Sequence, residues 1–423
     1  MNKKVWIVSI DMGYGHQRTA YPLKFLAQNG EIISANNYKE IPEKDRKIWK
    51  SSRAFYEAVS RFKKFPLLGE IAFYLFDLTQ KINSFYTKKN LSSSAFTQRR
   101  TESLFKRGWG KHFVEKLDSD IPFVSSFYNT AFMAEYFNYK GDIYCIVCDT
   151  DISRSWAPLS PKKSRIKYFT PNNRTTKRLK AYGVKEENII LTGYPLPLEN
   201  IEEETLKEDM KNRIINLDPC SKYREKYDFV IREKLGKLPL KSNHPLTIMF
   251  AVGGAGAQKE IGIKLVRKFK KELSEKKVKI ILVAGIKKKI KDYFEKEIVN
   301  GGLGNFLNHE VEVLYDNNFS DYYDKFNLAL RKTDILWTKP SELSFYAALG
   351  LPIIIAQPIG SQEDFNRRWL LKSGFGMDER DIGHAREWMY DLLDAGYLAE
   401  MAMEAFIEGN RDGTIKIKEH FEK

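Results

Sequence analysis

The sequence predicts an α/β protein made of two Rossmann-like domains, each built on a doubly wound parallel sheet. Apolar, strand-length runs alternate with helix-length segments in both halves of the chain, which favours parallel sheets. In each half an apolar run also leads into a glycine-rich turn: residues 5–10 precede 11–16, and residues 246–252 precede 253–258. Such a strand, turn and helix expose backbone N–H groups that suit a phosphate or another anion. We expect the two domains to face a central cleft.

In the first half, we expect strands at 5–10 and 31–35, separated by a helix from about Gln17 to Gln28. This helix should end near Asn29 and Gly30, a pair suited to a helix C-terminus. The alternation of strands and helices returns after residue 121. Strands are predicted at 122–126, 142–148, 165–169 and 188–192, and helices at 130–137 and 175–182.

Residues 47–117 differ from this pattern because they are aromatic and basic, with helical spacing and no strand alternation. They fit either a buried helical hairpin or an interfacial helix on a membrane surface. The same alternatives, core or membrane contact, hold for the stretch 60–90 within them. The sequence leaves both open.

The second half alternates more regularly. Its predicted strands are 246–252, 278–284, 311–315, 334–337 and 352–356, and its predicted helices are 258–275, 287–298, 320–331, 342–349, 363–373 and 384–408.

We therefore divide the chain into three parts. Residues 1–195 form an N-terminal, acceptor-side domain that carries the insertion 47–117. Residues 196–245 form a charge-rich helical connection, and residues 246–423 form a C-terminal donor domain. The last helices are candidates for packing back on the N-terminal domain.

Composition places the protein among folded soluble proteins, with 43% hydrophobic and 30% charged residues among 423. No apolar run approaches the ~20 residues of a membrane-spanning helix. The N-terminus enters a strand without a cleavage site for a secretory signal. We expect a cytoplasmic protein, peripheral at most on the inner face of the membrane.

The net charge of +15 suits a phosphate-rich partner or simply a lysine-rich, soluble surface. Cys145 and Cys148 have CxxC spacing but lie on one predicted strand, where residues three apart point to opposite faces. We expect two inert core cysteines rather than a zinc or redox site.

Four segments together resemble a known family. They are the loop 11–16, the run 144–149 with Trp156 and the segments 167–172 and 188–195, the glycine turn 253–258, and residues 338–363. They resemble the GT-B nucleotide-sugar glycosyltransferases, nearest the branch of monogalactosyldiacylglycerol synthase, the bacterial diacylglycerol glucosyltransferases and the peptidoglycan lipid-intermediate N-acetylglucosaminyltransferase. In the loop 11–16, Tyr14 stands where that branch usually has a glycine.

The resemblance implies a GT-B-like fold and an inverting, metal-independent transfer of a sugar from a nucleotide diphosphate, expected to be a uridine one, to an acceptor hydroxyl. The implied acceptor is a lipid at an anionic membrane surface, held near residues 60–90. No cofactor is implied, and we do not expect nucleic acid as a partner. The family's ribose-binding glutamate usually lies about one helical turn nearer the Gly-Leu-Pro at 350–352 than Glu342 does, where this chain has Phe345. Either Glu342 substitutes from the same helix face, or donor recognition differs.

Such a transfer needs a base for the acceptor hydroxyl. His16 begins a helix, whose dipole disfavours imidazolium, so it should be neutral at pH 7 and able to accept a proton. Asp11 is close enough in sequence to orient His16 or to be the base itself. Asp149 is a further candidate at the catalytic or acceptor side. A structural role for His16, as a capping or loop histidine, is the alternative.

The transfer also needs support for the leaving diphosphate and contacts to the sugar. Glycines allow the backbone to approach a diphosphate, and a lysine after a strand can add a cation. An amide and a carboxylate at a helix start can hold sugar hydroxyls. The donor-binding candidates are Gly13, Gly15, Gly253, Gly254, Ala255, Gly256, Gln258, Lys339, Ser341, Glu342, Gln362 and Glu363.

Asp149-Thr150-Asp151 has the form of a metal-binding DxD, and a divalent metal could bind there. We favour a structural or acceptor-side role. Two rival functions stay open. One is a nucleotide-sugar epimerase or hydrolase on the same fold. The other is a non-catalytic, basic nucleic-acid- or membrane-binding protein that has kept the fold.

Overall fold

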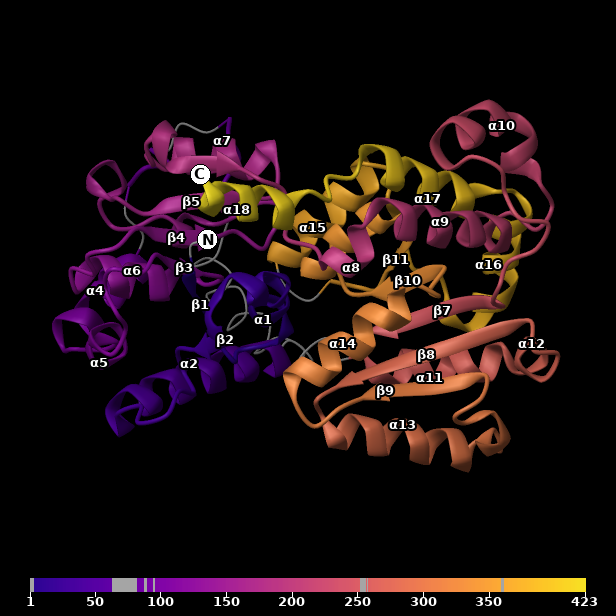
Figure 1. Ribbon diagram of the computed structural model, residues 1–423. Coiled ribbons are helices and arrows are strands. Elements are labelled where there is room, and N and C mark those ends of the chain that lie inside the picture. Colours follow the sequence, from indigo (N-terminus) through magenta and orange to yellow (C-terminus); the bar gives the residue numbers. More distant parts are fainter. Residues whose placement is uncertain are drawn as a thin grey trace. The chain divides into compact units, whose positions relative to one another are not determined.

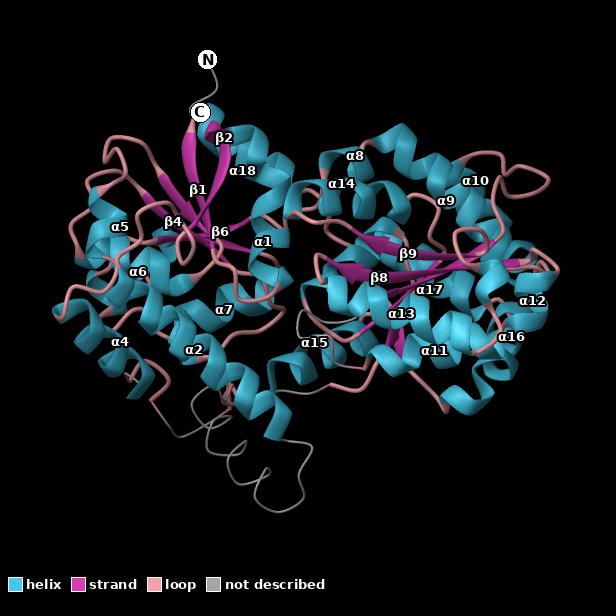
Figure 2. Cartoon of the chain, turned by 90° about the horizontal axis from the view of Figure 1, so that it is seen from below, coloured by secondary structure: helices cyan, strands magenta, loops and turns pink. Residues whose placement is uncertain are grey.

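The computed structural model describes residues 4–62, 82–86, 90–93, 96–251, 256, 258–358 and 361–423. The described residues contain two six-stranded parallel sheets, each in its own compact unit (Figure 1). The first unit comprises residues 1–196, 359–366 and 410–423, and the second comprises 197–358 and 367–409. Helices lie on both faces of each sheet (Figure 2). These sheets confirm the two predicted doubly wound α/β domains; the cleft between them stays a prediction.

The sheet of the first unit has the strand order β2-β1-β3-β4-β5-β6. Every neighbouring pair is parallel. Its strands are β1 (Val5–Ser9), β2 (Ala27–Ser34), β3 (Phe123–Ser125), β4 (Ile143–Ile146), β5 (Lys167–Thr170) and β6 (Ile189–Leu191).

The helices of the first unit connect these strands or extend from them. The described α-helices are α1 (Tyr14–Ala20), α2 (Glu43–Phe62), α4 (Phe96–Lys106), α5 (Lys111–Glu115), α6 (Tyr128–Tyr136), α7 (Asn173–Ala181) and α18 (Gly413–Glu422), and the described 3₁₀ helices are η1 (Tyr21–Leu26), η2 (Arg154–Trp156), η3 (Pro161–Lys163) and η4 (Glu186–Asn188). The aromatic and basic stretch 60–90 falls largely outside the described residues.

One face of this sheet is covered by η1 and α18. Alternate strand residues point to the same face, so Val5 and Ile7 of β1 share it with Tyr144 of β4. Ile417 and Phe421 of α18 belong to the same buried cluster. The C-terminal helix therefore completes the core of the first unit.

The predicted helix 17–28 is wrong in its second half. α1 ends at Ala20, a 3₁₀ helix with Pro22 in its first turn follows, and β2 already begins at Ala27. Asn29 and Gly30 do adopt left-handed conformations, with φ of 59° and 71°. They do so inside a strand, where the pairing of β1 with β2 shifts register between Val5 and Ile7. A left-handed pair fits such an irregularity as well as it fits a helix end.

The sheet of the second unit has the strand order β12-β11-β10-β7-β8-β9 and is also parallel throughout. The strand β12 was not predicted from the sequence. The strands are β7 (Leu246–Ala251), β8 (Val278–Gly285), β9 (Val311–Tyr315), β10 (Ile335–Thr338), β11 (Ile353–Ile355) and β12 (Gly376–Asp378).

Each helix predicted after residue 246 corresponds to a helical segment of the structure, but two of the predicted helices are each divided into shorter ones. The predicted helix 258–275 divides at Phe269, and 384–408 divides at Gly396, whose φ is +77°. The described helices are α8 (Leu198–Ile201), α9 (Glu203–Leu217), α10 (Lys222–Leu235), α11 (Lys259–Lys268), α12 (Lys270–Ser274), α13 (Lys288–Asn300), η5 (Gly304–Phe306), α14 (Phe319–Leu330), η6 (Glu342–Leu349), η7 (Ile382–His384), α16 (Ala385–Asp394) and α17 (Tyr397–Glu408), with α15 (Ser361–Lys372) divided between the units after Asn366.

The charge-rich segment 197–245 belongs to the second unit rather than standing apart as a connection. Arg213 of α9 is fully buried and donates to the carbonyls of Thr333 (2.8 Å) and Leu349 (2.6 Å). The predicted ranges differ from the units here and at residues 359–366, because long-range contacts decide which unit a segment joins. Residues 410–423 belong to the first unit, as considered for the last helices.

Close packing fixes the end of η6. Gly350 has a φ of +72°, and a Cβ at this position would lie 1.9 Å from Met210 Sδ. Both the conformation and the space require glycine.

Among the described residues, no helix is both long and apolar enough to cross a lipid bilayer.

Candidate functional site

Each sheet contains one point at which the strand order reverses. In the first unit β2 and β3 lie on opposite sides of β1, and in the second unit β8 and β10 lie on opposite sides of β7. Ligands of open α/β sheets bind in the crevice outside the carboxyl ends of the strands at such a switch point. The predicted glycine turns follow β1 and β7, the strands at these two switch points.

The loop after β1 is held by hydrogen bonds to Asn36. The Asp11 backbone N–H donates to Asn36 Oδ1 (2.7 Å), and Asn36 Nδ2 donates to the Asp11 carbonyl (3.1 Å). Gly13 precedes α1 with a φ of +113°, a conformation that needs glycine. The loop thus has a fixed shape up to the first turn of α1, which carries Gly15 and His16.

His16 lies at the switch point of the first sheet. Its Nδ1 is 2.8 Å from the carbonyl oxygen of Ser126, which directly follows β3. A carbonyl oxygen only accepts hydrogen bonds, so Nδ1 carries the proton and Nε2 is the nitrogen that accepts one. The ring also packs edge-on against Phe127, with centroids 4.8 Å apart, and Cys148 Sγ lies 3.7 Å from Nδ1. These contacts orient the imidazole.

Cys145 and Cys148 are both buried free thiols, as predicted. Burial raises the pKa of Cys145, so its thiol stays protonated at neutral pH. Cys148 is not only a core residue, because its sulfur contacts His16.

The loop after β4 is tied to Asn366, at the first-unit end of α15. Thr150 donates to Asn366 Oδ1 from its backbone N–H (3.0 Å) and its hydroxyl (2.8 Å), and Asn366 Nδ2 donates to Asp149 Oδ1 (3.2 Å). Asn172 Nδ2, at the N-cap of α7, donates to the Thr150 carbonyl (3.1 Å). Because β1, β3 and β4 are parallel, Asp149 lies at the same carboxyl edge of the sheet as His16.

Asp151 is committed to two arginines. Its carboxylate accepts from Arg178 (2.8 Å from both Nε and Nη2) and from Arg174 Nε (2.6 Å). Burial alone would lower the pKa of Arg178, but the hydrogen bonds and the charge of Asp151 outweigh it and raise that pKa. Both carboxylate oxygens of Asp151 thus take part in ion pairs with arginine.

In the second unit, the glycine turn after β7 is described only in part: Gly253, Gly254 and Ala255 lie outside the described residues. Gly256 has a φ of +71°, and a Cβ there would lie 2.6 Å from Ile290 Cδ1. Gln258 is the N-cap of α11, also left-handed, and its Nε2 donates to the Gln357 carbonyl (3.0 Å) after β11. This bond joins the loops that follow β7 and β11.

Lys339, Ser341 and Glu342 follow β10 directly. Ser341 is the N-cap of η6 and Glu342 is its first residue, with only 8% of its surface exposed. In a 3₁₀ helix residues three apart lie on the same face, so Glu342 and Phe345 share one. The Phe345 ring packs against Trp369, with centroids 5.4 Å apart. Glu342 therefore lies on the same helix face as position 345, as the sequence analysis considered for a substitute glutamate.

Gln362 and Glu363 lie in the first turn of α15, in the part assigned to the first unit. Lys339, Ser341 and Glu342 belong to the second unit. Within the first unit, the structure brings His16 and the loop of Asp149 together through Cys148. Sequence reasoning missed Asn366, which is distant in the chain, and the Ser126 carbonyl, a backbone group that leaves no sequence signal.

Comparison with known proteins finds one family match, a domain of unknown function (DUF6938), over residues 238–415. No curated protein matches. Among similar solved structures are MurG of Acinetobacter baumannii (TM-score 0.48, 11% identity, 99% of each chain covered) and a glycosyltransferase from Rickettsia africae (0.41, 15%, 99% of each). Another is the UDP-GlcNAc 2-epimerase from Neisseria meningitidis bound to UDP-GlcNAc (0.44, 12%, 83% of this chain and 87% of the other). These names include both enzyme classes considered from the sequence, and at such identities they assign no role to a single residue.

Proposed function

We propose that the protein is an inverting, metal-independent glycosyltransferase that moves a sugar from a uridine diphosphate donor to an acceptor hydroxyl. The observation that carries this proposal is the hydrogen bond between His16 Nδ1 and the Ser126 carbonyl at the switch point of the first sheet. It leaves Nε2 as the proton-accepting nitrogen of an oriented imidazole, which is what deprotonation of an acceptor alcohol requires.

In this mechanism His16 Nε2 takes the proton of the acceptor hydroxyl while the oxygen of that hydroxyl attacks the anomeric carbon of the donor sugar. The bond from that carbon to the diphosphate oxygen breaks, so the configuration inverts and the nucleoside diphosphate leaves with the bonding electrons. Cys148 and Phe127 hold the ring in place. Asp149 serves the acceptor side, and Asp11 orients the loop through its backbone.

The leaving diphosphate is assigned to the second unit. Backbone N–H groups of the turn 253–258 and the ammonium of Lys339 after β10 would support its negative charge. Glu342 would hold the ribose, since Phe345 stands where the resembling family has its glutamate. Gln362 and Glu363 would hold the sugar hydroxyls. No divalent metal is needed in this scheme, because Lys339 and main-chain amides carry that task and Asp151 is paired with arginine.

For the acceptor we propose a lipid at an anionic membrane surface. The net charge of +15 and the aromatic, basic character of residues 60–90 support this assignment. The corresponding location is cytoplasmic, at the inner face of the membrane.

A panel of nucleotide sugars and nucleotides in a thermal-shift assay tests the donor assignment. A ligand bound only by the native state at 100 times its Kd should stabilise it by about 2.7 kcal/mol. We expect UDP and one UDP-sugar to raise the melting temperature. No shift with any nucleotide, together with salt-sensitive RNA binding, would favour a nucleic-acid-binding protein instead.

The same UDP-sugar then tests the reaction. We expect UDP release that depends on added lipid acceptor and continues in EDTA. Acceptor-independent release of UDP, or conversion of the sugar to its epimer seen by proton NMR, would replace the transferase by an epimerase or hydrolase. Loss of activity in EDTA and recovery with Mn²⁺ would contradict the metal-independent scheme.

A further inference from the structure

Positive charge is concentrated in one segment of the second unit. Residues 259–297, which extend from the start of α11 to near the end of α13, contain fourteen Lys and Arg residues and six Asp and Glu residues. This segment therefore has a net charge of +8 out of +15 for the whole chain, and the remaining 384 residues together have only +7. The excess is local, which a generally lysine-rich surface does not explain.

The two longer helices of this segment form one surface. α11 and α13 lie side by side on one face of the second sheet (Figure 2). The Lys259 ammonium lies 3.8 Å from the centroid of the Tyr293 ring, and Arg267 Nη2 lies 3.7 Å from Glu297 Oε2. The buried apolar side chains of the two helices are Ile263, Leu265 and Val266 on α11 and Ile290, Phe294 and Ile298 on α13. The charged residues occupy the opposite, outward sides of both helices.

Most acids of the segment are already paired with cations. The four ion pairs are Glu272 with Arg386 (2.6 Å), Glu275 with Lys277 (2.7 Å), Glu295 with Lys291 (3.4 Å) and Glu297 with Arg267 (3.7 Å). Glu260 and Asp292 are the other two acids, and both are exposed.

Four exposed lysines of α11 and α13 form no ion pair with any residue that the structure describes: Lys264, Lys288, Lys289 and Lys296. We call the outward surface that carries them the basic face. Its unpaired lysines outnumber its two unpaired acids, so it attracts a partner with spread negative charge.

The residue types of the segment favour a lipid bilayer over a nucleic acid as that partner. Of its fourteen cations, thirteen are lysine. Nucleic-acid sites favour arginine, which binds phosphate in a bidentate way, and exposed aromatic rings that stack on bases. All of 259–297 is described, and none of its rings is exposed: Phe269 and Phe294 are buried, and Tyr293 is half-buried beneath Lys259. A lysine ammonium is a compact charge that suits a layer of anionic headgroups.

We propose that the basic face binds the headgroups of an anionic lipid bilayer. The choice of a bilayer rests on the proposed function, whose acceptor is a lipid, and it adds a membrane contact in the second unit to the one assigned to residues 60–90. The attraction acts within a Debye length of the headgroups, about 8 Å at physiological salt.

Co-sedimentation with lipid vesicles tests the proposal on the full chain without nucleotide or acceptor. We expect binding to vesicles of phosphatidylglycerol and phosphatidylcholine, weakening as salt rises, and much weaker binding to phosphatidylcholine alone. In the basic-face variant, Lys264, Lys288, Lys289 and Lys296 are all replaced by Gln. Since each lysine near an anionic surface contributes about a fivefold factor in affinity, the variant should bind roughly a hundredfold or more weakly.

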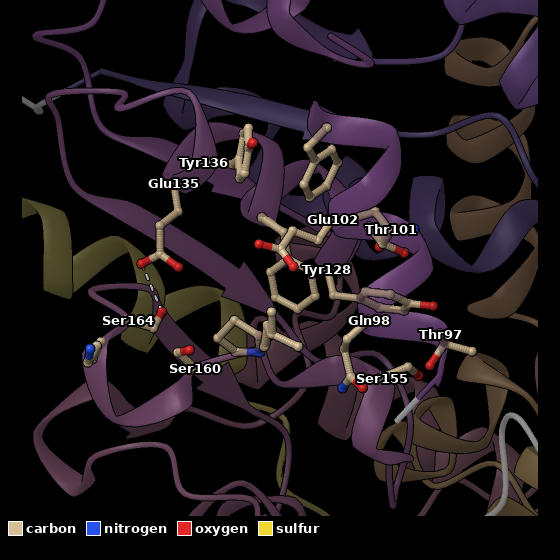
Figure 3. Close-up of a pocket in the computed structure, with 16 residues that line it drawn as sticks. Thr97, Gln98, Thr101, Glu102, Tyr128, Glu135, Tyr136, Ser155, Ser160 and Ser164 are labelled. Carbon is tan, nitrogen blue, oxygen red and sulfur yellow. Dashed lines mark hydrogen bonds between the residues drawn. The ribbon is translucent and has the colours of Figure 1, made fainter. Parts of the chain in front are cut away.

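The matched control removes four exposed lysines of the first unit that also lack an ion pair among the described residues, by replacing Lys140, Lys162, Lys163 and Lys177 with Gln. Of these, Lys163 lines the pocket of about 260 Å³ that Figure 3 shows. The control keeps the same net charge as the basic-face variant, so it should bind anionic vesicles close to the wild type. Both variants should bind UDP like the wild type in the thermal-shift assay, which shows that they are folded and tests the donor site separately.

Three results would overturn the proposal: no preference for anionic over neutral vesicles, equal loss of vesicle binding in the two variants, or tighter binding to single-stranded RNA than to anionic vesicles at the same salt concentration. Loss of UDP binding or of acceptor-dependent UDP release, with vesicle binding intact, would instead contradict the proposed function.

Discussion

The two units each have a six-stranded parallel sheet with a switch point beside its first strand, but they carry different groups at these points. In the first unit, side chains dominate: His16 is oriented by the Ser126 carbonyl, and Asn366 holds the loop of Asp149. In the second unit, the switch point is bordered by backbone segments. Gln258 joins the loop after β7 to the loop after β11, and a buried 3₁₀ helix follows β10. The proposed function assigns proton transfer to the first set of groups and donor binding to the second.

The two units also contain buried arginines whose hydrogen-bond partners differ. Arg178 of the first unit is paired with the carboxylate of Asp151, which raises the pKa of Arg178 despite its burial. Arg213 of the second unit donates to backbone carbonyls, and burial lowers its pKa. Burial of Arg178 is thus compensated by an ion pair, and burial of Arg213 by hydrogen bonds to main-chain carbonyls.

The largest effect is expected from Asp151→Asn, which leaves Arg178 as an uncompensated buried cation. Removing one partner of a buried ion pair costs about 3–5 kcal/mol, so the free energy of unfolding should fall by that amount in chemical denaturation. Glu186→Gln breaks the surface pair with Lys180 and should cost less than about 1 kcal/mol. Both residues belong to the first unit. Equal losses in the two variants would show that this unit does not depend on its buried ion pair.

His16→Ala comes next, because it removes the proposed base without touching the second unit. Transfer of a labelled sugar should fall by ~10²-fold or more, the usual scale for a general base. UDP binding should be unchanged. His112→Ala is the control, since His112 lies in the same unit and bonds to the Tyr38 hydroxyl (2.8 Å). Near-normal transfer by His16→Ala would exclude His16 from the mechanism.

Lys339→Met should show the opposite behaviour. We expect UDP affinity to fall by about tenfold, as for the loss of one charge-assisted hydrogen bond. Lys332→Met removes an equal charge at the other edge of the sheet, just before β10, and should leave UDP affinity close to that of the wild type in calorimetry. If both variants weakened binding equally, the donor site would not lie at this switch point.

The smallest effect concerns His420 of α18, whose Nε2 lies 3.0 Å from the Tyr144 hydroxyl. Burial, then the nearby Lys167, lowers the pKa of His420. Below the ordinary histidine value of about 6.5, the unfolded chain therefore binds a proton that the folded one resists. Stability should fall as pH drops through this range, and His420→Leu should flatten that part of the pH profile. An unchanged slope would contradict this role of His420.

Local patterns predicted most of the fold. The runs that became β1, β4, β7 and β8 are apolar and bounded by turns, so their strands were found within a few residues. The error at Asn29 and Gly30 arose where tertiary contacts decide, because they have the left-handed conformation of a helix end but lie in a strand. The last helices were candidates for packing back on the N-terminal domain, and of these α18 contributes Ile417 and Phe421 to the core of the first unit.

The candidate site was predictable only where its chemistry depends on residue type. His16, Asp149 and the glycines were visible in the sequence because each lies in a short motif after a strand. The contacts that orient them were not visible. The Ser126 carbonyl is a backbone group, and Asn366 reaches Thr150 across 216 residues, a separation that no local pattern encodes.

The return of α18 to the first unit has a consequence for how the protein is made. A ribosome synthesises the chain from the N-terminus, and domains generally fold as units during synthesis. Residues 413–422 supply part of the core around Tyr144 and Phe169, so the unit that starts first is completed only after the second unit has been translated. Until then, the nascent first unit has part of one hydrophobic face uncovered, and we expect a chaperone to bind it at this stage.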